Sequence, residues 1–103
     1  METQEILDTS VAIERSSGNI TIFTALEYPS ALSKKFTIIF PDVLDYTQAI
    51  QLAQLLKLKG TPVGAVDMMI AAICLNKKWR LLTKDKDFKD IAAVAPELEV
   101  KFE

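Results

Sequence analysis

The sequence predicts an α/β domain whose sheet is parallel or mostly parallel. Short runs of β-branched and aromatic residues alternate along the chain with segments in which apolar residues recur at helical spacing. Gly, Pro, Asn and Ser separate these segments, as they do in turns. Strands that alternate with helices are typical of parallel sheets covered by helices.

Five runs favour extended structure and five segments favour helices. The expected strands are 5–7, 20–24, 36–40, 80–83 and 100–102. The expected helices are 11–16, one that begins within 25–28, 43–56, 65–78 and 88–94. Ser16–Asn19 and Thr61–Gly64 are predicted to be loops, because turn-forming residues are concentrated in both.

The ends of the predicted helices carry recognisable signals. Thr9 or Ser10 is expected to cap the first helix and Asp42 the third, since their side-chain oxygens can accept from free backbone N–H groups. Gly60 is expected to end the third helix. Pro29 either belongs to the first turn of the second helix or stops it, and Pro96 breaks the last one.

The composition is that of one intracellular domain, which we expect to span residues 1–103. Half of the residues are hydrophobic, so the chain can bury a core of ordinary size. Cys74 is the only cysteine and is expected in the core, so no internal disulfide can form and the reducing cytoplasm is the expected location. The polar, acidic opening Met1–Glu5 predicts no secretory leader, and no apolar run is long enough to span a bilayer.

The absence of histidine narrows the possible chemistry. Without histidine, Ser-His-Asp triads, histidine general bases and the usual zinc sites are all excluded. Any catalysis must therefore depend on carboxylates, lysine, tyrosine, hydroxyl groups or a hard metal ion.

Four acidic residues lie where a parallel sheet would bring them together. Asp8 and Asp85 follow predicted strands, Asp67 begins the helix that precedes the 80–83 strand, and Glu27 follows the second strand-like run. Ligands of open α/β sheets bind beyond the carboxyl ends of the strands. Clustered carboxylates repel one another, so the arrangement needs a cation, and oxygen ligands favour Mg²⁺ or Mn²⁺. Such ions support phosphodiester hydrolysis.

Each acid taken alone also has an ordinary structural explanation. Asp67 would favour the helix dipole at the start of its helix. Asp85 and Asp87 belong to a Lys-Asp-Lys-Asp run that is typical of a solvated turn, and Glu27 by itself is uninformative. The functional interpretation depends on the joint pattern of the four acids.

Three segments resemble the sequence motifs of PIN domains. Leu7-Asp8-Thr9-Ser10-Val11 resembles the opening strand motif of that family. The segment 59–72 (KGTPVGAVDMMIAA) is similar to its third acidic motif, and 82–88 (LTKDKDF) is similar to its fourth, in which a Thr precedes the acid and a Phe follows. The last two motifs form a continuous match over about the C-terminal 60 residues.

The resemblance implies a three-layer α/β/α fold and an Mg²⁺- or Mn²⁺-dependent endoribonuclease. The implied metal site and catalytic acids are Asp8, Glu27, Asp67 and Asp85. The implied supporting residues are Thr9, Ser10, Thr83 and Asp87. In the VapC-like branch of the family, such a ribonuclease toxin pairs with an antitoxin that blocks the site, and it forms homodimers. Trp79, Met68 and Met69 are candidates for the dimer contact.

Binding of RNA must depend on local positive charge, because the net charge is −2. Nine of the twelve Lys and Arg residues lie from Lys57 onward. The candidates for phosphate contacts are Lys77, Lys78, Arg80, Lys84, Lys86 and Lys89. The structural alternative is that each of these side chains is solvated surface.

Two other functions stay open at this point. Only 18 residues separate Asp8 from Glu27, fewer than in typical VapC-like proteins, so a non-catalytic PIN-like module that binds RNA or a protein is the first alternative. A receiver-like phosphoacceptor domain is the second, although no predicted middle strand ends in a suitable aspartate.

Overall fold

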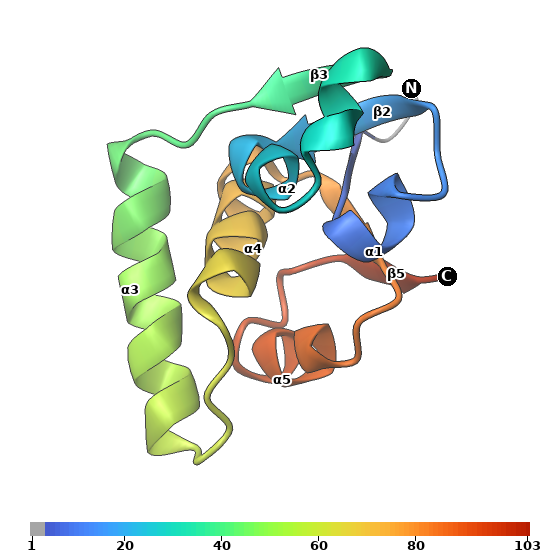
Figure 1. Ribbon diagram of the computed structural model, residues 1–103. Coiled ribbons are helices and arrows are strands. Elements are labelled where there is room, and N and C mark those ends of the chain that lie inside the picture. Colours follow the sequence, from blue (N-terminus) through green and yellow to red (C-terminus); the bar gives the residue numbers. More distant parts are fainter. Residues whose placement is uncertain (1–3) are drawn as a thin grey trace.

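A computed structural model of the protein describes residues 4–103. Its elements follow one another along the chain (Figure 1) as β1 (Glu5–Leu7), α1 (Thr9–Ala12), β2 (Ser17–Thr21), α2 (Ile22–Glu27), the 3₁₀ helix η1 (Pro29–Ser33), β3 (Lys35–Ile39), α3 (Val43–Leu58), α4 (Ala65–Lys77), β4 (Arg80–Thr83), α5 (Asp87–Val94) and β5 (Val100–Phe102). Residues 1–3 of the expected domain lie outside this range.

The strands form two parallel groups. The first has the order β1-β4-β5, with Ile6 opposite Leu81 and Leu82 opposite Lys101. The second contains β2 and β3, with Ile20 opposite Ile38. All the ladders within residues 4–103 are therefore parallel, as the sequence predicted.

Helices cover both faces of the strands, which gives three layers. Side chains of a strand alternate between its two faces. Ile6 and Leu81 pack into a core with α3, α4 and α5, whereas Leu7 and Leu82 pack into a second core with α1, α2 and η1. The expected α/β/α fold is confirmed.

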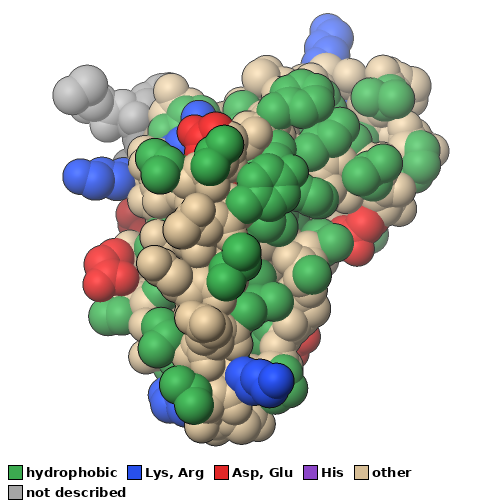
Figure 2. Space-filling model, turned by 90° about the vertical axis from the view of Figure 1, so that its left-hand side faces the viewer, with side chains coloured by type: hydrophobic (Ala, Val, Ile, Leu, Met, Phe, Trp, Pro, Cys, Tyr) green, Lys and Arg blue, Asp and Glu red, His purple; other side chains and the backbone are tan. Residues whose placement is uncertain are grey.

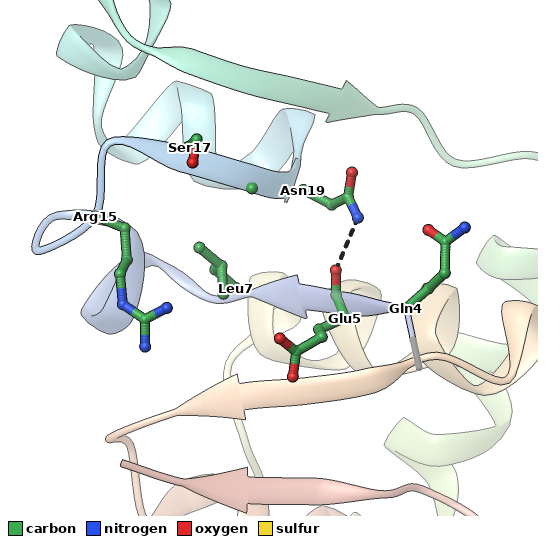
Figure 3. Close-up of a pocket in the computed structure, with 7 residues that line it drawn as sticks. Gln4, Glu5, Leu7, Arg15, Ser17 and Asn19 are labelled. Carbon is green, nitrogen blue, oxygen red and sulfur yellow. Dashed lines mark hydrogen bonds between the residues drawn. The ribbon is translucent and has the colours of Figure 1, made fainter. Parts of the chain in front are cut away.

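The group β2–β3 runs opposite to the group β1-β4-β5 (Figure 3). A parallel return to the sheet needs a crossover of about a dozen residues or more. Only residues 8–16 join β1 to β2, and they contain a single helical turn. The short connection between Asp8 and Glu27 therefore turns β2 back along β1. A hollow of about 430 Å³, lined by Glu5, Leu7, Arg15 and Asn19 among others, lies between these two strands.

The region between Ser16 and Glu27 differs from the predicted elements. Ser17–Asn19 was predicted to be a loop, but it pairs with β3 and so becomes extended. Residues 22–24 were predicted to end a strand, but they begin α2, because the Thr21 hydroxyl accepts from the Thr24 N–H (3.3 Å) and caps the helix. Tyr28 ends α2, and Pro29 starts η1.

The long C-terminal elements agree with their predictions. Asp42 caps α3 through a capping box with Asp45, and Gly60, with a φ of +77°, follows the end of α3. Cys74 is buried in α4, as expected. The predicted N-terminal cap of the first helix was wrong, because Asp8 rather than Thr9 or Ser10 caps α1.

No helix in residues 4–103 is long and apolar enough to cross a membrane. Much of the outward side of α3 is nevertheless apolar (Figure 2).

Gly18 permits the close approach of β2 to β1, and we expect Gly18→Ala to destabilise the fold. Its φ is +135°, and an added Cβ would lie 2.9 Å from Leu7 Cδ1. The strain should lower the free energy of unfolding by about 1–2 kcal/mol. Urea unfolding measures this loss. Gly64→Ala is the control, because Gly64 has φ −62° and nothing lies within 4 Å of an added Cβ. Equal stability of the two variants would contradict the prediction.

Candidate metal centre

Three aspartates form a compact cluster near the C-terminal end of β4. Asp67 lies in the first turn of α4, Asp85 follows β4, and Asp87 begins α5. One carboxylate oxygen from each lies within 4.8 Å of the other two. The sequence predicted that Asp67 and Asp85 lie together, with Asp87 in a supporting position, but in the structure the Asp87 carboxylate is as close as those of the other two.

Asp8 is held rigidly at the neighbouring strand end. It follows β1, and its side chain is buried, with 4% of the residue exposed. One carboxylate oxygen accepts from the Ser10 hydroxyl (2.5 Å) and the Val11 N–H (3.3 Å), and the other accepts from the Thr83 hydroxyl (2.5 Å). A buried carboxylate needs such donors because it has lost its water shell.

Ser10 and Thr83 also connect Asp8 to the loop that carries Asp85. The Lys84 N–H donates to Ser10 Oγ (2.9 Å), and the Asp85 N–H donates to Thr83 Oγ1 (2.9 Å). The two acidic strand ends are therefore fixed relative to each other by two hydroxyl groups.

Glu27 approaches the cluster from the last residue of α2. The Thr9 hydroxyl donates to Glu27 Oε1 (2.7 Å) and lies 3.2 Å from the Thr24 hydroxyl. These two contacts of Thr9 connect α1 to α2. Thr24 is completely buried and was not among the predicted supporting residues, because it was expected in a strand.

The pKa of Asp67 is raised by its burial and by the neighbouring carboxylates. It is raised from 3.8 to about 6, first by burial and then by repulsion from Asp85, Asp8, Asp87 and Glu27. Carboxylates that repel one another in a partly buried hollow favour the protonated form of one of them. The five acids thus form one electrostatic unit around Asp67.

The basic residues near these acids differ in what they can contribute. Lys86 is exposed at the start of α5, whereas the Lys84 ammonium pairs with Glu14 (2.5 Å). Arg80 begins β4, at the end opposite to Asp85, and pairs with Glu5 (2.5 Å). Arg80 therefore lies at the edge of the sheet opposite to the acidic end of β4, and its predicted contact with RNA stays a prediction.

A cation bound by oxygen ligands would fit this set of acids. The cluster contains only carboxylates and hydroxyl groups, which are the donors that Mg²⁺ and Mn²⁺ prefer. Acids near the carboxyl ends of parallel strands, covered by helices on both faces, place the chain among α/β proteins whose candidate site is a cluster of carboxylates.

The chain belongs to the PIN-domain family, whose model matches residues 26–94. This range contains Glu27, Asp67, Asp85 and Asp87. A search of curated proteins by sequence found no match.

Solved structures confirm the fold over nearly the whole chain. The DNA-bound VapBC from Salmonella typhimurium matches with a TM-score of 0.77 and 19% identity, covering 98% of each chain. VapBC2 from Rickettsia felis, bound to a DNA fragment from its promoter, matches at 0.77 and 17%, covering 95% of this chain and 97% of the other. VapBC-5 from Mycobacterium tuberculosis, of the VapBC family of toxin-antitoxin systems, matches at 0.69 and 21%, covering 98% of each.

Proposed function

We propose that the protein is an Mg²⁺- or Mn²⁺-dependent endoribonuclease that acts as the toxin of a toxin–antitoxin pair. The observation that carries this proposal is the convergence of Asp67, Asp85 and Asp87, with Asp8 and Glu27 close enough to raise the pKa of Asp67 further. Such crowding lowers stability unless a cation joins the acids. A centre that favours a divalent cation suits phosphodiester hydrolysis.

The proposed metal ligands are Asp8, Glu27, Asp67 and Asp85. Asp87 is a further candidate ligand, because one of its carboxylate oxygens lies within 4.8 Å of those of Asp67 and Asp85. A bound Mg²⁺ or Mn²⁺ would activate a water molecule and offset the charge that develops on the phosphoryl group.

The chain itself provides the positioning of the acids. Ser10 and Thr83 hold the Asp8 carboxylate in one orientation, which preserves its geometry when other groups move. Thr9 anchors the exposed Glu27 through one oxygen, so that the acid can orient a water molecule at the solvent side of the hollow. Preorganised groups of this kind lower the barrier because they need not rearrange during the reaction.

Lysine side chains supply the proposed phosphate contacts. Lys86 is exposed and lies between Asp85 and Asp87 in the sequence, and Lys84 precedes Asp85. RNA phosphates would compete with Glu14 for the ammonium group of Lys84. Because such contacts release counterions from RNA, binding should weaken steeply as salt increases.

The proposed protein partner is an antitoxin. The similar solved structures are VapBC assemblies, and one is described as belonging to toxin-antitoxin systems. An antitoxin that covers the acidic hollow would keep RNA out of it, and the toxin would act on RNA in the cytoplasm. The proposal also includes a homodimer.

A non-catalytic PIN-like module is the second candidate, and the short connection between β1 and β2 favours it, because it reverses β2. Isothermal titration with Mn²⁺ separates the two functions. The nuclease should bind the ion, whereas a module that has lost its metal centre should not.

The proposal predicts cleavage of RNA that requires a divalent ion. We expect the purified protein to cut a mixed-sequence single-stranded RNA in Mg²⁺ or Mn²⁺, and excess EDTA to abolish the products. Adding Mn²⁺ in excess of the EDTA should restore the cleavage products, because the acidic cluster needs the ion and the fold does not. Gel analysis of end-labelled RNA measures this. Equal cleavage with and without EDTA would refute the metal requirement.

A further inference from the structure

Phe102 is an exposed aromatic residue at the end of β5, beside the strand that leads into the acidic loop. Strand β5 pairs with β4 in parallel, and Phe102 lies opposite Thr83. The Glu103 N–H donates to the Thr83 carbonyl (2.9 Å), so the pairing continues past Phe102. Neighbouring strands lie about 4.8 Å apart. The Phe102 ring is therefore carried one strand away from Thr83, whose hydroxyl contacts both Asp8 and the Asp85 N–H.

The Phe102 ring lies on the same face of the sheet as the Thr83 side chain. Residues opposite each other on parallel strands point to the same face, and the preceding pair on this face is Leu81 with Val100. Both of these side chains pack into the core that is covered by α3, α4 and α5. The Lys89 ammonium of α5 lies 5.6 Å from the centroid of the Phe102 ring, which agrees with this placement. The ring thus faces the helix that follows the acidic loop.

The Phe102 ring is available for contact, because it is not absorbed into the core. It is 40% exposed, whereas Phe88, the other phenylalanine of this region, is completely buried in α5. A partly exposed ring keeps apolar surface on which a second planar group can stack. Proteins that bind single-stranded nucleic acids use such rings, with cationic side chains nearby, as platforms for bases.

Lys86 and Lys89 supply the positive charge that a nucleic acid needs beside such a platform. Both are exposed, and because they are three residues apart at the start of α5, they lie on the same side of the helix. Neither forms an ion pair with another side chain in the part of the chain that the structure describes. Their ammonium groups can therefore bind phosphates while the Phe102 ring contacts a base.

We propose that Phe102 stacks on a base of single-stranded RNA whose neighbouring phosphates are bound by Lys86 and Lys89. This inference rests on the proposed nuclease function and specifies its substrate class. Every base has a flat face, so stacking tolerates any sequence, but that face must be free. In a double helix the faces are covered by adjacent bases, so the acidic cluster receives RNA from single-stranded segments.

Two substitutions of Phe102 separate stacking from apolar packing. Phe102→Leu keeps an apolar side chain but removes the ring, so affinity for a single-stranded RNA should fall about 10-fold. Phe102→Tyr keeps the ring and should bind like the wild type. Fluorescence anisotropy in EDTA measures binding without cleavage. Phe40→Leu is the matched control, because Phe40 is 66% exposed between β3 and α3, outside the segments that carry the acids. Circular dichroism establishes that each variant is folded.

A strand of equal length with abasic sites separates stacking from charge. The wild type and Phe102→Leu should bind this strand equally, because it has phosphates but no bases. For ordinary RNA the loss in Phe102→Leu should be the same at low and high salt, since stacking releases no counterions. Lys89→Gln should instead weaken binding most at low salt, where a phosphate contact contributes most.

Four results would overturn the proposal. They are equal binding of ordinary RNA by Phe102→Leu and the wild type, an equal loss on ordinary and abasic strands, a loss in Phe102→Tyr as large as in Phe102→Leu, and wild-type binding of duplex RNA as tight as that of single strands. Cleavage that does not depend on Phe102 would refute this inference alone. Binding through Phe102 without cleavage would refute the nuclease proposal alone, and a wild type that binds no RNA would refute both.

Discussion

Asp67→Asn is expected to reduce cleavage of RNA by at least about 100-fold while leaving the fold intact. Asp67 is the acid on which burial and four other carboxylates act together, so its charge is the one that a cation would offset most directly. The amide has nearly the same shape but no charge. Binding of Mn²⁺, measured by titration calorimetry, should weaken in parallel. Glu97→Gln is the control, because Glu97 is exposed in the segment before β5, outside the cluster.

The same substitution should stabilise the metal-free protein at neutral pH. Because the pKa of Asp67 is raised from 3.8 to about 6, the folded state holds this proton more tightly than the unfolded chain does. Its contribution to stability is therefore present below 3.8 and is lost as pH rises through about 6. After allowance for its partial exposure, the loss is about 1 kcal/mol. In EDTA, Asp67→Asn should thus become more stable than the wild type as pH rises.

Binding of Mn²⁺ and protonation of Asp67 should compete, and the melting temperature of the wild type should show this competition. Mn²⁺ should raise its melting temperature near neutral pH, where Asp67 is ionised, and should have little effect on Asp67→Asn. A variant that cleaves like the wild type would remove Asp67 from the catalytic centre. A variant that unfolds would be replaced by Asp85→Asn, which follows β4 in a half-exposed loop.

The C-terminal part of the fold could be predicted because its elements are long and supported locally. Helix α3 has a capping box at its start and a glycine after its end, and the strand 80–83 has the apolar pair Leu81-Leu82 at its centre. The convergence of Asp67 and Asp85 followed from the rule that strand ends share one edge of a sheet.

The segment 16–27 could not be predicted, because long-range pairing overrides its local signals. Ser17 and Gly18 have weak strand preferences and are extended only through their pairing with β3. Ile22 and Phe23 prefer strands but begin a helix after the Thr21 cap. The position of Glu27 depends on both boundaries, so sequence alone could not place it against Thr9.

The sequence also could not predict which face of α3 is buried. Val43, Tyr46 and Ile50 recur at helical spacing, yet they lie outward, while Asp45 is buried. Asp45 accepts from the Asp42 N–H (2.9 Å) and the Asn76 side-chain amide (2.8 Å), which satisfies it in the core. Because apolar residues lie on every side of α3, their spacing does not indicate which face of the helix is buried.

Thr83→Val should lower both stability and cleavage, because one hydroxyl group performs two functions. Thr83 is completely buried, donates to Asp8 and accepts from the Asp85 N–H. Valine keeps the shape but leaves the buried carboxylate of Asp8 without one of its donors. The free energy of unfolding should fall by about 2–3 kcal/mol, which is the cost of an unmet hydrogen bond to a buried charged group.

Two control variants separate the effect of losing the Thr83 hydroxyl from that of losing its methyl group and from that of losing a threonine hydroxyl elsewhere. Thr83→Ser keeps the donor and should retain most of the cleavage, although it loses packing of about 1 kcal/mol. Thr47→Val removes a hydroxyl that bonds only to the Val43 carbonyl on the exposed side of α3, so its effect should be small. If Thr83→Ser lost as much cleavage as Thr83→Val, then packing would explain the effect. Retention by serine alone would indicate that the orientation of Asp8, rather than its mere presence, determines the activity of the acidic cluster.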